Sequence, residues 1–254
     1  MSQRRGHRSA RGPCSSLGGI VPLADRQVSD GRAGSLPDLS ELAGHIVTAS
    51  RHMNALGINQ GMSGNISARV ADGFLVTPTS FPYDQMSAAD VVRCDAAGSV
   101  RGGGRQSSEW RLHRDILASR PEIGAVVHAH PKSCTALALH GRSIPPVHYM
   151  VAICGGPDIR CARYETFGTQ ELSDAVLVAL KGRTACLMAH HGMIALGETV
   201  DQALWRAVEV ETLAAQYLAS LALGEPPHLS DEEIERVLMK MRDYAHGQRP
   251  PAET

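Results

Sequence analysis

The stretch "EIGAVVHAHP", residues 122–131, gives the clearest indication of the fold, because an apolar run in it ends in two alternating histidines. The apolar run favours a strand, in which successive side chains point to opposite faces. His128 and His130 therefore share one face, and Ala129 between them lies on the other. Two adjacent imidazoles suit a metal ion, but a histidine at the solvent end of a strand is also common, so the pair needs a third ligand.

Periodicity on both sides of this stretch predicts an alternation of helices and strands. Helices are expected over 36–57, from near Ser107, over 131–140, over 173–182, and over the two long C-terminal segments 197–223 and 229–247. Strands are expected over 61–70, 73–80, 122–130 and 145–153, with a strand pair over 184–196. Capping-box pairs, Thr199 with Gln202 and Ser230 with Glu233, mark the starts of the last two helices.

The composition excludes several classes of function. The chain has 254 residues, of which 43% are hydrophobic, and a net charge of -1 with a pI near 6.9. It is long enough for one core of α/β size, and it offers no basic field for nucleic acid or an anionic membrane. No apolar run reaches the roughly 20 residues of a membrane span, and no secretory signal begins the chain. We therefore expect a cytoplasmic protein with no nucleic-acid or membrane partner.

Six cysteines are scattered without a C-x-x-C pair, which argues against a disulfide framework and a thiolate zinc site. We expect reduced, mostly buried thiols, with a pairing of Cys154 and Cys161 as the alternative. Residues 1–37 are rich in Arg, Ser and Gly, and we expect them to be a disordered extension. An inert extension or a misplaced start codon is favoured there over a transit peptide. A disordered tail is expected over 247–254.

A third histidine is available in "AHHG", where the apolar run of residues 184–189 ends at His190 and His191. In an extended segment these two face opposite ways, so we expect one to be a ligand and the other to be packed or hydrogen-bonded. Glu109 adds a carboxylate, although acids are favoured in the first turn of any helix. Three histidines with Glu109 nearby would form a zinc site with an exchangeable position, which is typical of catalytic zinc.

Polar turns suggest that the ligand carries a phosphate. Ser107 and Ser108 precede a helix, where free amides and hydroxyls favour an anion, although Ser107 is also an ordinary N-cap residue. The turns "SGN", which includes Asn65, and "TPTS", which includes Thr79 and Ser80, supply further neutral donors. Neither a P-loop nor a dinucleotide-binding glycine motif occurs, so a small sugar phosphate is the expected ligand.

Seven segments in order resemble the class II aldolase and adducin-like family, and within it the bacterial L-fuculose-1-phosphate aldolases. They are "SGNISAR", "VTPTSFPYDQM", "SSEWRLHRDIL", "VVHAHP", "IPPVHYM", "AHHGMIAL" and "ALWRAVEVE". The resemblance covers about residues 38–246, which we take as the catalytic domain. It implies a single α/β domain with a central, mostly antiparallel sheet flanked by helices, consistent with the predicted elements.

The resemblance also implies roles for individual residues. One Zn²⁺ per subunit would be held by His128, His130 and His191, with Glu109 as a further ligand or as the acid/base, and His190 would be a neighbour. The phosphate of dihydroxyacetone phosphate would be bound by Asn65, Thr79, Ser80, Ser107 and Ser108. Tyr149 would handle the proton on the aldehyde-derived oxygen across a subunit boundary in a homotetramer with active sites at its interfaces.

The aldehyde side matches the family less well. Phe167 and Tyr244 correspond to family positions near the site, but each is also explained as a packing residue, and Met241 stands where the family has another aromatic. The resemblance thus implies a zinc-dependent aldolase that cleaves L-fuculose 1-phosphate, or a similar deoxyketose 1-phosphate, to dihydroxyacetone phosphate and L-lactaldehyde or a similar small aldehyde.

Several rivals stay open within the same fold. These are methylthioribulose-1-phosphate dehydratase, sugar-acid-phosphate decarboxylases and L-ribulose-5-phosphate 4-epimerase. The epimerase's "HADY"-like stretch is replaced here by "VHYM". A non-catalytic adducin-like interaction module is disfavoured, because such modules typically lose the three histidines.

Overall fold

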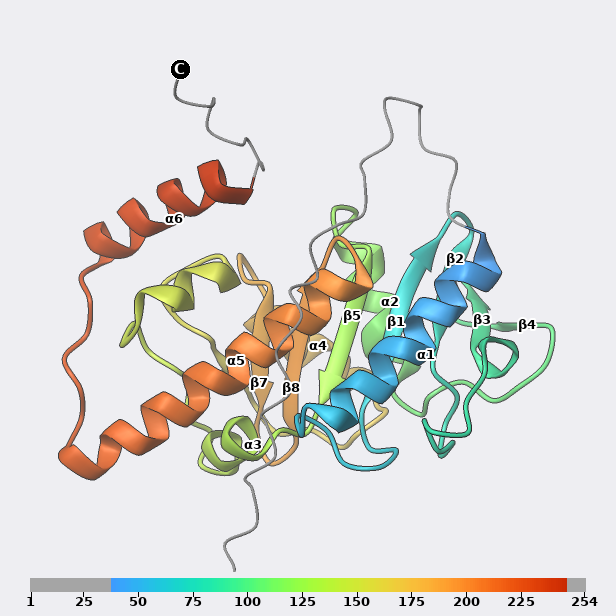
Figure 1. Cartoon of the computed structure of the whole chain (residues 1–254), viewed down its shortest axis with the longest axis horizontal. Helices are drawn as coiled ribbons and strands as arrows, with labels where there is room; N and C mark the ends of the chain where they lie inside the picture. Colours follow the sequence, from blue (N-terminus) through green and yellow to red (C-terminus); the bar gives the residue numbers. More distant parts are fainter. Residues whose placement is uncertain (1–37, 246–254) are drawn as a thin grey trace, which may run out of the picture. The chain divides into compact units, whose positions relative to one another are not determined.

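The computed structural model describes residues 38–245, and these form one mixed sheet between two layers of helices (Figure 1). The spatial order of the eight strands is β4-β3-β2-β1-β5-β8-β7-β6. Neighbouring strands are antiparallel except β6 and β7, which are parallel. The predicted fold, a mostly antiparallel sheet flanked by helices, is confirmed.

The strands are short, and those at the centre of the sheet are buried on both faces. Their bounds are β1 Asn65–Val70, β2 Gly73–Val76, β3 Val92–Asp95, β4 Val100–Arg101, β5 Ala125–Ala129, β6 Cys161–Ala162, β7 Ala185–Met188 and β8 Gly192–Gly197. The central strand β5 lies between β1 and β8, with His128 opposite Asn65 on one side and Ile194 on the other. This register brings the ends of three strands together at His128.

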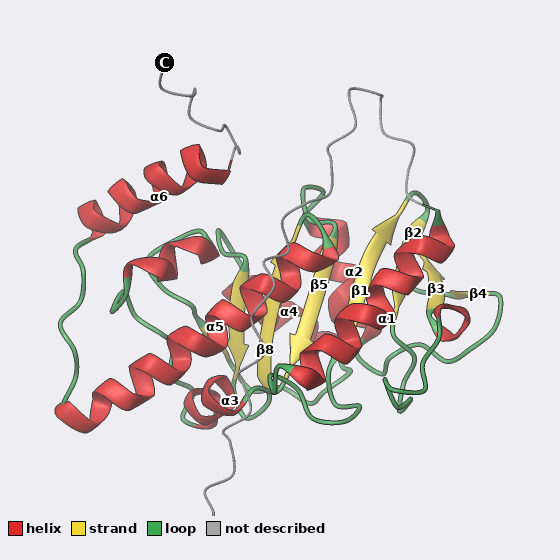
Figure 2. Ribbon diagram, viewed as in Figure 1, coloured by secondary structure: helices red, strands yellow, loops and turns green. Residues whose placement is uncertain are grey.

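Each face of the sheet has its own apolar core. One face packs against α1 (Leu39–Ala55), α3 (Lys132–Leu139) and α5 (Val200–Ser220), through side chains such as Ile46, Leu137 and Leu213. The other face packs against α2 (Trp110–Ser119) and α4 (Gln170–Ala179), through Ile116 and Val176. In Figure 2, α1 and α5 cross in front of the strands and α4 lies behind them. The last helix, α6 (Asp231–Ala245), follows, and short 3₁₀ helices η1 (Ala88–Asp90), η2 (Tyr149–Cys154) and η3 (Leu221–Leu223) complete the fold.

Most predicted elements are present with shifted ends. The Thr199 hydroxyl accepts the Gln202 N–H at the start of α5, and the Ser230 hydroxyl accepts the Glu233 N–H at the start of α6, as the capping boxes predicted. The helix expected over 173–182 instead begins at Gln170, because the Thr169 hydroxyl caps it by accepting the Leu172 N–H. The strand expected over 145–153 was wrong, since Tyr149–Cys154 forms the 3₁₀ helix η2.

The remaining predictions about the chain as a whole have different outcomes. The five described cysteines are free thiols, including Cys154 and Cys161, and four of them are buried. Within residues 38–245 no helix is both long and apolar enough to cross a membrane. Residues 1–37, which include Cys14, and residues 247–254 lie outside the described residues, so the disorder predicted for them stays a prediction. The catalytic-domain boundary at residue 246 also stays a prediction.

Candidate active site

Three histidines meet where β5 and β7 end and β8 begins. His128 is the fourth residue of β5, His130 follows the strand, and His191 lies in the turn between β7 and β8. Their ligand nitrogens all lie within 4.8 Å of one another, and the ring centroids are 4.7 to 5.0 Å apart. The structure therefore brings together the three histidines that the sequence singled out.

The two consecutive histidines of "AHHG" separate as expected. His190 takes a left-handed backbone conformation, with φ of 54°, and its ring meets the edge of Tyr164 at 5.8 Å. His191 points the other way, into the histidine cluster. A turn of this kind places two adjacent imidazoles on different sides of the site, so that one residue of the pair joins the cluster.

Glu109, the N-cap residue of α2, completes the cluster. Its carboxylate oxygens lie 3.1 Å from His128 Nε2 and 3.3 Å from His191 Nε2. The residue is only 4% exposed, and Oε1 accepts no hydrogen bond from any described residue. Buried carboxylate oxygens are normally paired, so this oxygen calls for a cation or a bound ligand.

The donor set fits a divalent transition metal. His128 Nδ1 lies 2.9 Å from the carbonyl oxygen of Met193, which fixes the proton there and leaves the Nε2 lone pair facing the cluster. His130 Nε2 is 2.9 Å from His128 Nε2, so nitrogen atoms converge on one point. Three imidazoles and one carboxylate are a typical donor set for zinc and related ions.

The electrostatics of the cluster favour the ligand forms of His130, His191 and Glu109, whereas for His128 the Glu109 carboxylate and the Met193 carbonyl oxygen outweigh burial and raise its pKa. Burial, together with the charges of neighbouring histidines, lowers the pKa of His130 to about 3 and that of His191 to about 4. Burial would raise the pKa of Glu109, but His128, His191 and the amide of Asn65 outweigh it and hold that pKa well below its usual range. Near neutral pH, His130 and His191 are therefore neutral imidazoles beside an ionised carboxylate.

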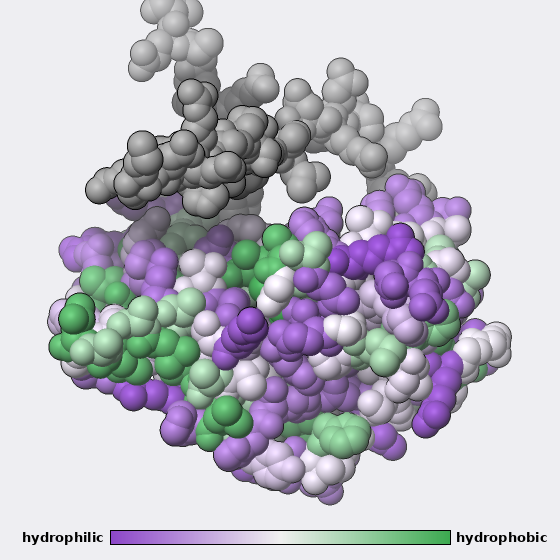
Figure 3. All heavy atoms as spheres, turned by 60° about the horizontal axis from the view of Figure 1, so that its bottom comes forward, coloured by the Kyte–Doolittle hydropathy of each residue, from purple (hydrophilic) through white to green (hydrophobic). Residues whose placement is uncertain are grey.

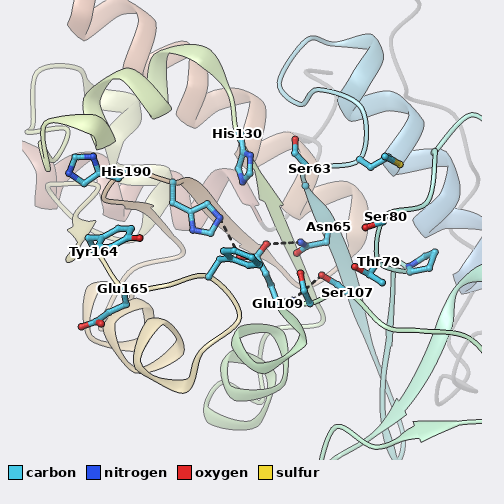
Figure 4. Close-up of a pocket in the computed structure, with 16 residues that line it drawn as sticks. Ser63, Asn65, Thr79, Ser80, Ser107, Glu109, His130, Tyr164, Glu165 and His190 are labelled. Atoms are coloured by element: carbon cyan, nitrogen blue, oxygen red, sulfur yellow. Dashed lines mark hydrogen bonds and ion pairs between the residues drawn. The ribbon is translucent and has the colours of Figure 1, made fainter.

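A pocket of about 410 Å³ opens beside the cluster (Figure 4). Glu109, His130 and His191 line it, whereas His128 is fully buried beneath them. All five residues predicted to bind phosphate line the same pocket: Asn65, Thr79, Ser80, Ser107 and Ser108. Figure 4 shows Asn65, Thr79, Ser80 and Ser107 on one side of Glu109, and Tyr164, Glu165 and His190 on the other. The pocket thus has a wall of small polar groups and a second wall of larger side chains.

The helix beside Ser107 starts later than predicted. Residues 107–109 form a turn in which the Trp110 N–H donates to the Ser107 carbonyl oxygen, and α2 begins at Trp110 with Glu109 as its N-cap. The Ser107 hydroxyl accepts the Glu109 N–H at 3.2 Å. Ser107 therefore orients the backbone of Glu109 rather than capping the helix itself.

Glycine is required in the "SGN" turn. A Cβ on Gly64 would lie 2.5 Å from the His128 carbonyl oxygen and 2.7 Å from Asn59 Oδ1. The buried Tyr83 hydroxyl donates to the Gly64 carbonyl oxygen and holds the turn from outside. The turn packs directly on β5, which places Asn65 next to the histidine cluster.

Some predicted site residues are not brought to the pocket. Tyr149, in η2, is 52% exposed and does not line the pocket. Phe167 does line it, although its side chain is 65% exposed, so the packing alternative was wrong. Tyr244 lies in the last turn of α6, and its side chain is outside the described part of the molecule, so its role stays a prediction.

Sequence reasoning missed several residues of the pocket lining. Tyr164, Glu165, Met62 and Ser63 were not predicted, and His190 was expected only as a neighbour of the metal site. Ser63 could have been found from its place in the "SGN" turn. Tyr164 and Glu165 carried only one signal, their nearness in the chain to Phe167. No residue-spacing rule identifies a loop that folds over the site.

Comparisons with known proteins identify relatives of this chain. The model of the class II aldolase and adducin N-terminal domain matches residues 44–218. A 5-methylthioribulose-1-phosphate/5-deoxyribulose-1-phosphate aldolase of Rhodospirillum rubrum is 49% identical over 207 residues, covering 82% of this chain and 94% of the relative. The L-fuculose phosphate aldolase of Escherichia coli K12 is 48% identical over 206 residues, covering 81% and 96%.

A solved structure of an L-fuculose 1-phosphate aldolase has the same fold. It superimposes with a TM-score of 0.78 at 32% sequence identity, covering 80% of this chain and 97% of the other. The family match extends over more than half of the chain, and both relatives are aligned over nearly their whole length. The chain therefore belongs to the class II aldolase and adducin N-terminal domain family.

Proposed function

We propose that this protein is a zinc-dependent aldolase that cleaves a deoxyketose 1-phosphate to dihydroxyacetone phosphate and a small aldehyde. One observation carries the proposal: Glu109 and two of the clustered histidines line the same pocket as five small polar residues suited to a phosphate. An enzyme that breaks the C3–C4 bond of a ketose 1-phosphate, one bond away from the ketone, needs a metal-binding group and a phosphate-binding group within the length of one substrate.

The zinc ion would be held by His128, His130 and His191, with Glu109 as the fourth ligand. Two observations support this assignment: the buried Oε1 of Glu109 accepts no hydrogen bond from the described residues, and one ring nitrogen of each histidine converges on the same place. When bound, zinc supplies Lewis-acid polarisation of the substrate's carbonyl group. Substrate entry would free the Glu109 carboxylate for proton transfer, because the fourth position of a catalytic zinc site is exchangeable.

Asn65, Thr79, Ser80, Ser107 and Ser108 would bind the phosphate of the substrate. The pocket lining contains no lysine or arginine among the described residues, so the donors are neutral hydroxyl and amide groups. Short polar turns with free amides bind phosphate in this way. They would hold the three-carbon phosphate half of the ketose in a fixed orientation beside Glu109.

Glu109 would move the proton at the reacting carbon. In the direction of synthesis, its carboxylate removes a proton from the carbon next to the carbonyl group of dihydroxyacetone phosphate. In the direction of cleavage the C3–C4 bond breaks, its electron pair stays on C3, and Glu109 returns the proton there. The lowered pKa of Glu109 keeps it ionised near neutral pH, as a base must be.

Tyr149 would exchange the proton of the aldehyde-derived oxygen from a second copy of the chain in a homotetramer. Its half-exposed ring, stacked on His148 at 4.8 Å, supports a role at a surface rather than in the core. Figure 3 shows patches of hydrophobic side chains among polar ones on one face of the molecule, and patches of this kind can form subunit contacts. Phe167 and Tyr244 would complete the aldehyde side.

L-fuculose 1-phosphate is the first substrate candidate, and 5-methylthioribulose 1-phosphate or 5-deoxyribulose 1-phosphate is the second. The two relatives named for these activities are 48% and 49% identical to this chain, which is why the second candidate is retained. All three ketose phosphates share the dihydroxyacetone phosphate half. They differ in the aldehyde, which carries a hydroxyl group in L-lactaldehyde and an apolar group in the others.

The test is a comparison of kcat/KM for these three substrates with the zinc-loaded protein, following dihydroxyacetone phosphate. Release from at least one of them is expected, and the highest value identifies the substrate. Water loss from methylthioribulose 1-phosphate, release of CO₂ from a sugar-acid phosphate, or epimerisation of L-ribulose 5-phosphate would instead support a rival enzyme of this fold. Failure of every reaction in zinc-loaded protein would favour an adducin-like interaction module.

A further inference from the structure

His113 lies beneath the site and is absent from the metal cluster and from the pocket lining. Its ring is fully buried, with 0% exposure, on the side of α2 that faces β1. Its Nδ1 lies 2.7 Å from the Ser67 hydroxyl, and its Nε2 contacts Asn65 Oδ1. Asn65 and Ser67 alternate on β1 and so share a face, and Glu109 and His113 are one turn apart on the chain. Four side chains therefore form one connected row.

The row has one arrangement of protons that satisfies every member. The amide Nδ2 of Asn65 donates to Glu109 Oε2 at 3.0 Å, and an ionised carboxylate can only accept. Asn65 Oδ1 therefore faces His113 and needs a donor there, which must be Nε2–H. A neutral imidazole has one donor and one acceptor, so Nδ1 accepts the Ser67 O–H. Burial lowers the pKa of His113 to about 3, which keeps the ring neutral.

The opposite tautomer of His113 would exchange donors and acceptors along this row of hydrogen-bonded side chains. If Nδ1 carried the proton, Nε2 would need a donor, and the Asn65 amide would have to turn over to supply it. The amide oxygen of Asn65 would then face the Glu109 carboxylate. The N–H groups of Asn65 would point away from the pocket that this residue lines. Two acceptors at hydrogen-bonding distance repel each other in a buried site.

We propose that His113 is a positioning residue that fixes the Asn65 amide with its N–H groups toward Glu109 and the pocket. Asn65 can then hydrogen-bond the carboxylate and offer a donor to a phosphate. The tautomer itself is independent of the reaction, but the effect on turnover rests on the proposed aldolase function. A side chain that fills the same space without a donor at the Nε2 position would leave Asn65 free to turn.

The direct test is the tautomer of His113 in the full-length, zinc-loaded protein. Long-range ¹H–¹⁵N correlation spectra distinguish the two neutral forms, and His113→Gln identifies the His113 signals by their loss. A neutral ring protonated on Nε2 at neutral pH is expected. A ring protonated on Nδ1, or a doubly protonated ring, would overturn the proposal whatever reaction the protein catalyses.

Substituting His113 by each of two amide side chains, glutamine and asparagine, tests whether its Nε2 donor affects turnover. Glutamine at position 113 places its N–H₂ near the Nε2 position, whereas asparagine reaches only the Nδ1 position. His113→Gln should retain most of the kcat for dihydroxyacetone phosphate release, and His113→Asn and His113→Leu should lose about 10- to 100-fold, with a raised KM. Zinc content and Tm serve to compare folding among the variants.

Equal losses in His113→Gln and His113→Asn, at equal zinc content and Tm, would show that the ring only fills space and would contradict the proposal. If the wild-type protein released no dihydroxyacetone phosphate, the aldolase function would fail, and the tautomer measurement would still decide the role of His113. The same variants can then be compared by their affinity for inorganic phosphate, which should fall in His113→Asn and not in His113→Gln.

Discussion

Glu109 joins the two halves of the site, because its carboxylate contacts His128 and His191 and also the amide of Asn65. A helix that begins one residue after Glu109 holds it in place, and the Ser107 hydroxyl accepts its backbone N–H. Because of this connection, substitutions at residue 109 are expected to separate metal binding from chemistry.

Glu109→Gln should keep most of the zinc and lose most of the turnover. Glutamine retains the shape and an oxygen atom but cannot take a proton, and general acid–base catalysis typically contributes about 10²- to 10⁴-fold. Zinc content by elemental analysis and kcat for dihydroxyacetone phosphate release are the two measurements. Full activity in this variant would mean that another group moves the proton.

His191→Ala should lose zinc, and His190→Ala should keep it. The two residues are adjacent in sequence, yet only His191 belongs to the cluster within the described residues, since His190 turns toward Tyr164. The matched pair controls for local folding of the β7–β8 turn. Equal zinc content in the two variants, measured after dialysis, would show that His191 is not a ligand.

Sequence predicted the individual polar residues of the pocket well, because hydroxyls, amides and histidines at strand ends have few structural reasons to be there. It left open which of His190 and His191 is a ligand until the family resemblance was considered. The reason is physical: a single left-handed residue, His190, decides the direction of both side chains, and histidine seldom adopts that conformation.

At the scale of elements, the tight contact between β5 and β8 determines where the histidines lie. A Cβ on Gly192 would be 2.5 Å from the Ala129 carbonyl oxygen and 2.7 Å from His130 Cδ2. The first residue of β8 therefore has to be small, so that the end of β5 can approach and hold His130 toward His191.

Gly192→Ala should push His130 out of the cluster and weaken zinc binding, with a loss of stability. Gly44→Ala is the control, because a Cβ on Gly44 meets nothing within 4 Å in the middle of α1. That change should stabilise the protein by about 0.5–1 kcal/mol, the usual difference between the two residues in a helix. Urea unfolding and zinc affinity test both, and unchanged zinc affinity in Gly192→Ala would contradict this account.

The segment 145–153 shows why one predicted strand was wrong. Its valine, tyrosine and isoleucine residues favour a strand, but the His148 side chain accepts the Met150 N–H and Gly155 ends the segment with φ of 89°. These local caps turn the chain into η2, whose side chains Val151, Ala152 and Cys154 enter the core. Strands β1, β2, β5, β7 and β8 were predictable because each continues a hairpin or carries an uninterrupted apolar run, whereas the short strands β3, β4 and β6 were not predicted.

At the scale of the whole molecule, zinc should stabilise the fold, because its proposed ligands come from β5, the β7–β8 turn and the start of α2. A ligand present at 100 times its Kd stabilises a native state by about 2.7 kcal/mol. Removing zinc with a chelator should therefore lower Tm by about 5–10 °C for a domain of this size. Calorimetry before and after chelation, and after zinc is restored, checks this, and an unchanged Tm would argue against zinc bound across these elements.

The most direct measurement of the central claim is dihydroxyacetone phosphate release from L-fuculose 1-phosphate and 5-methylthioribulose 1-phosphate by purified protein. It should be made on the protein as isolated, after chelation, and after one equivalent of zinc is restored. We predict release from at least one substrate, loss of that activity on chelation, and its return with zinc. Zinc-loaded protein that releases no dihydroxyacetone phosphate from either substrate, or chelated protein that remains fully active, would contradict the assignment as a zinc-dependent aldolase.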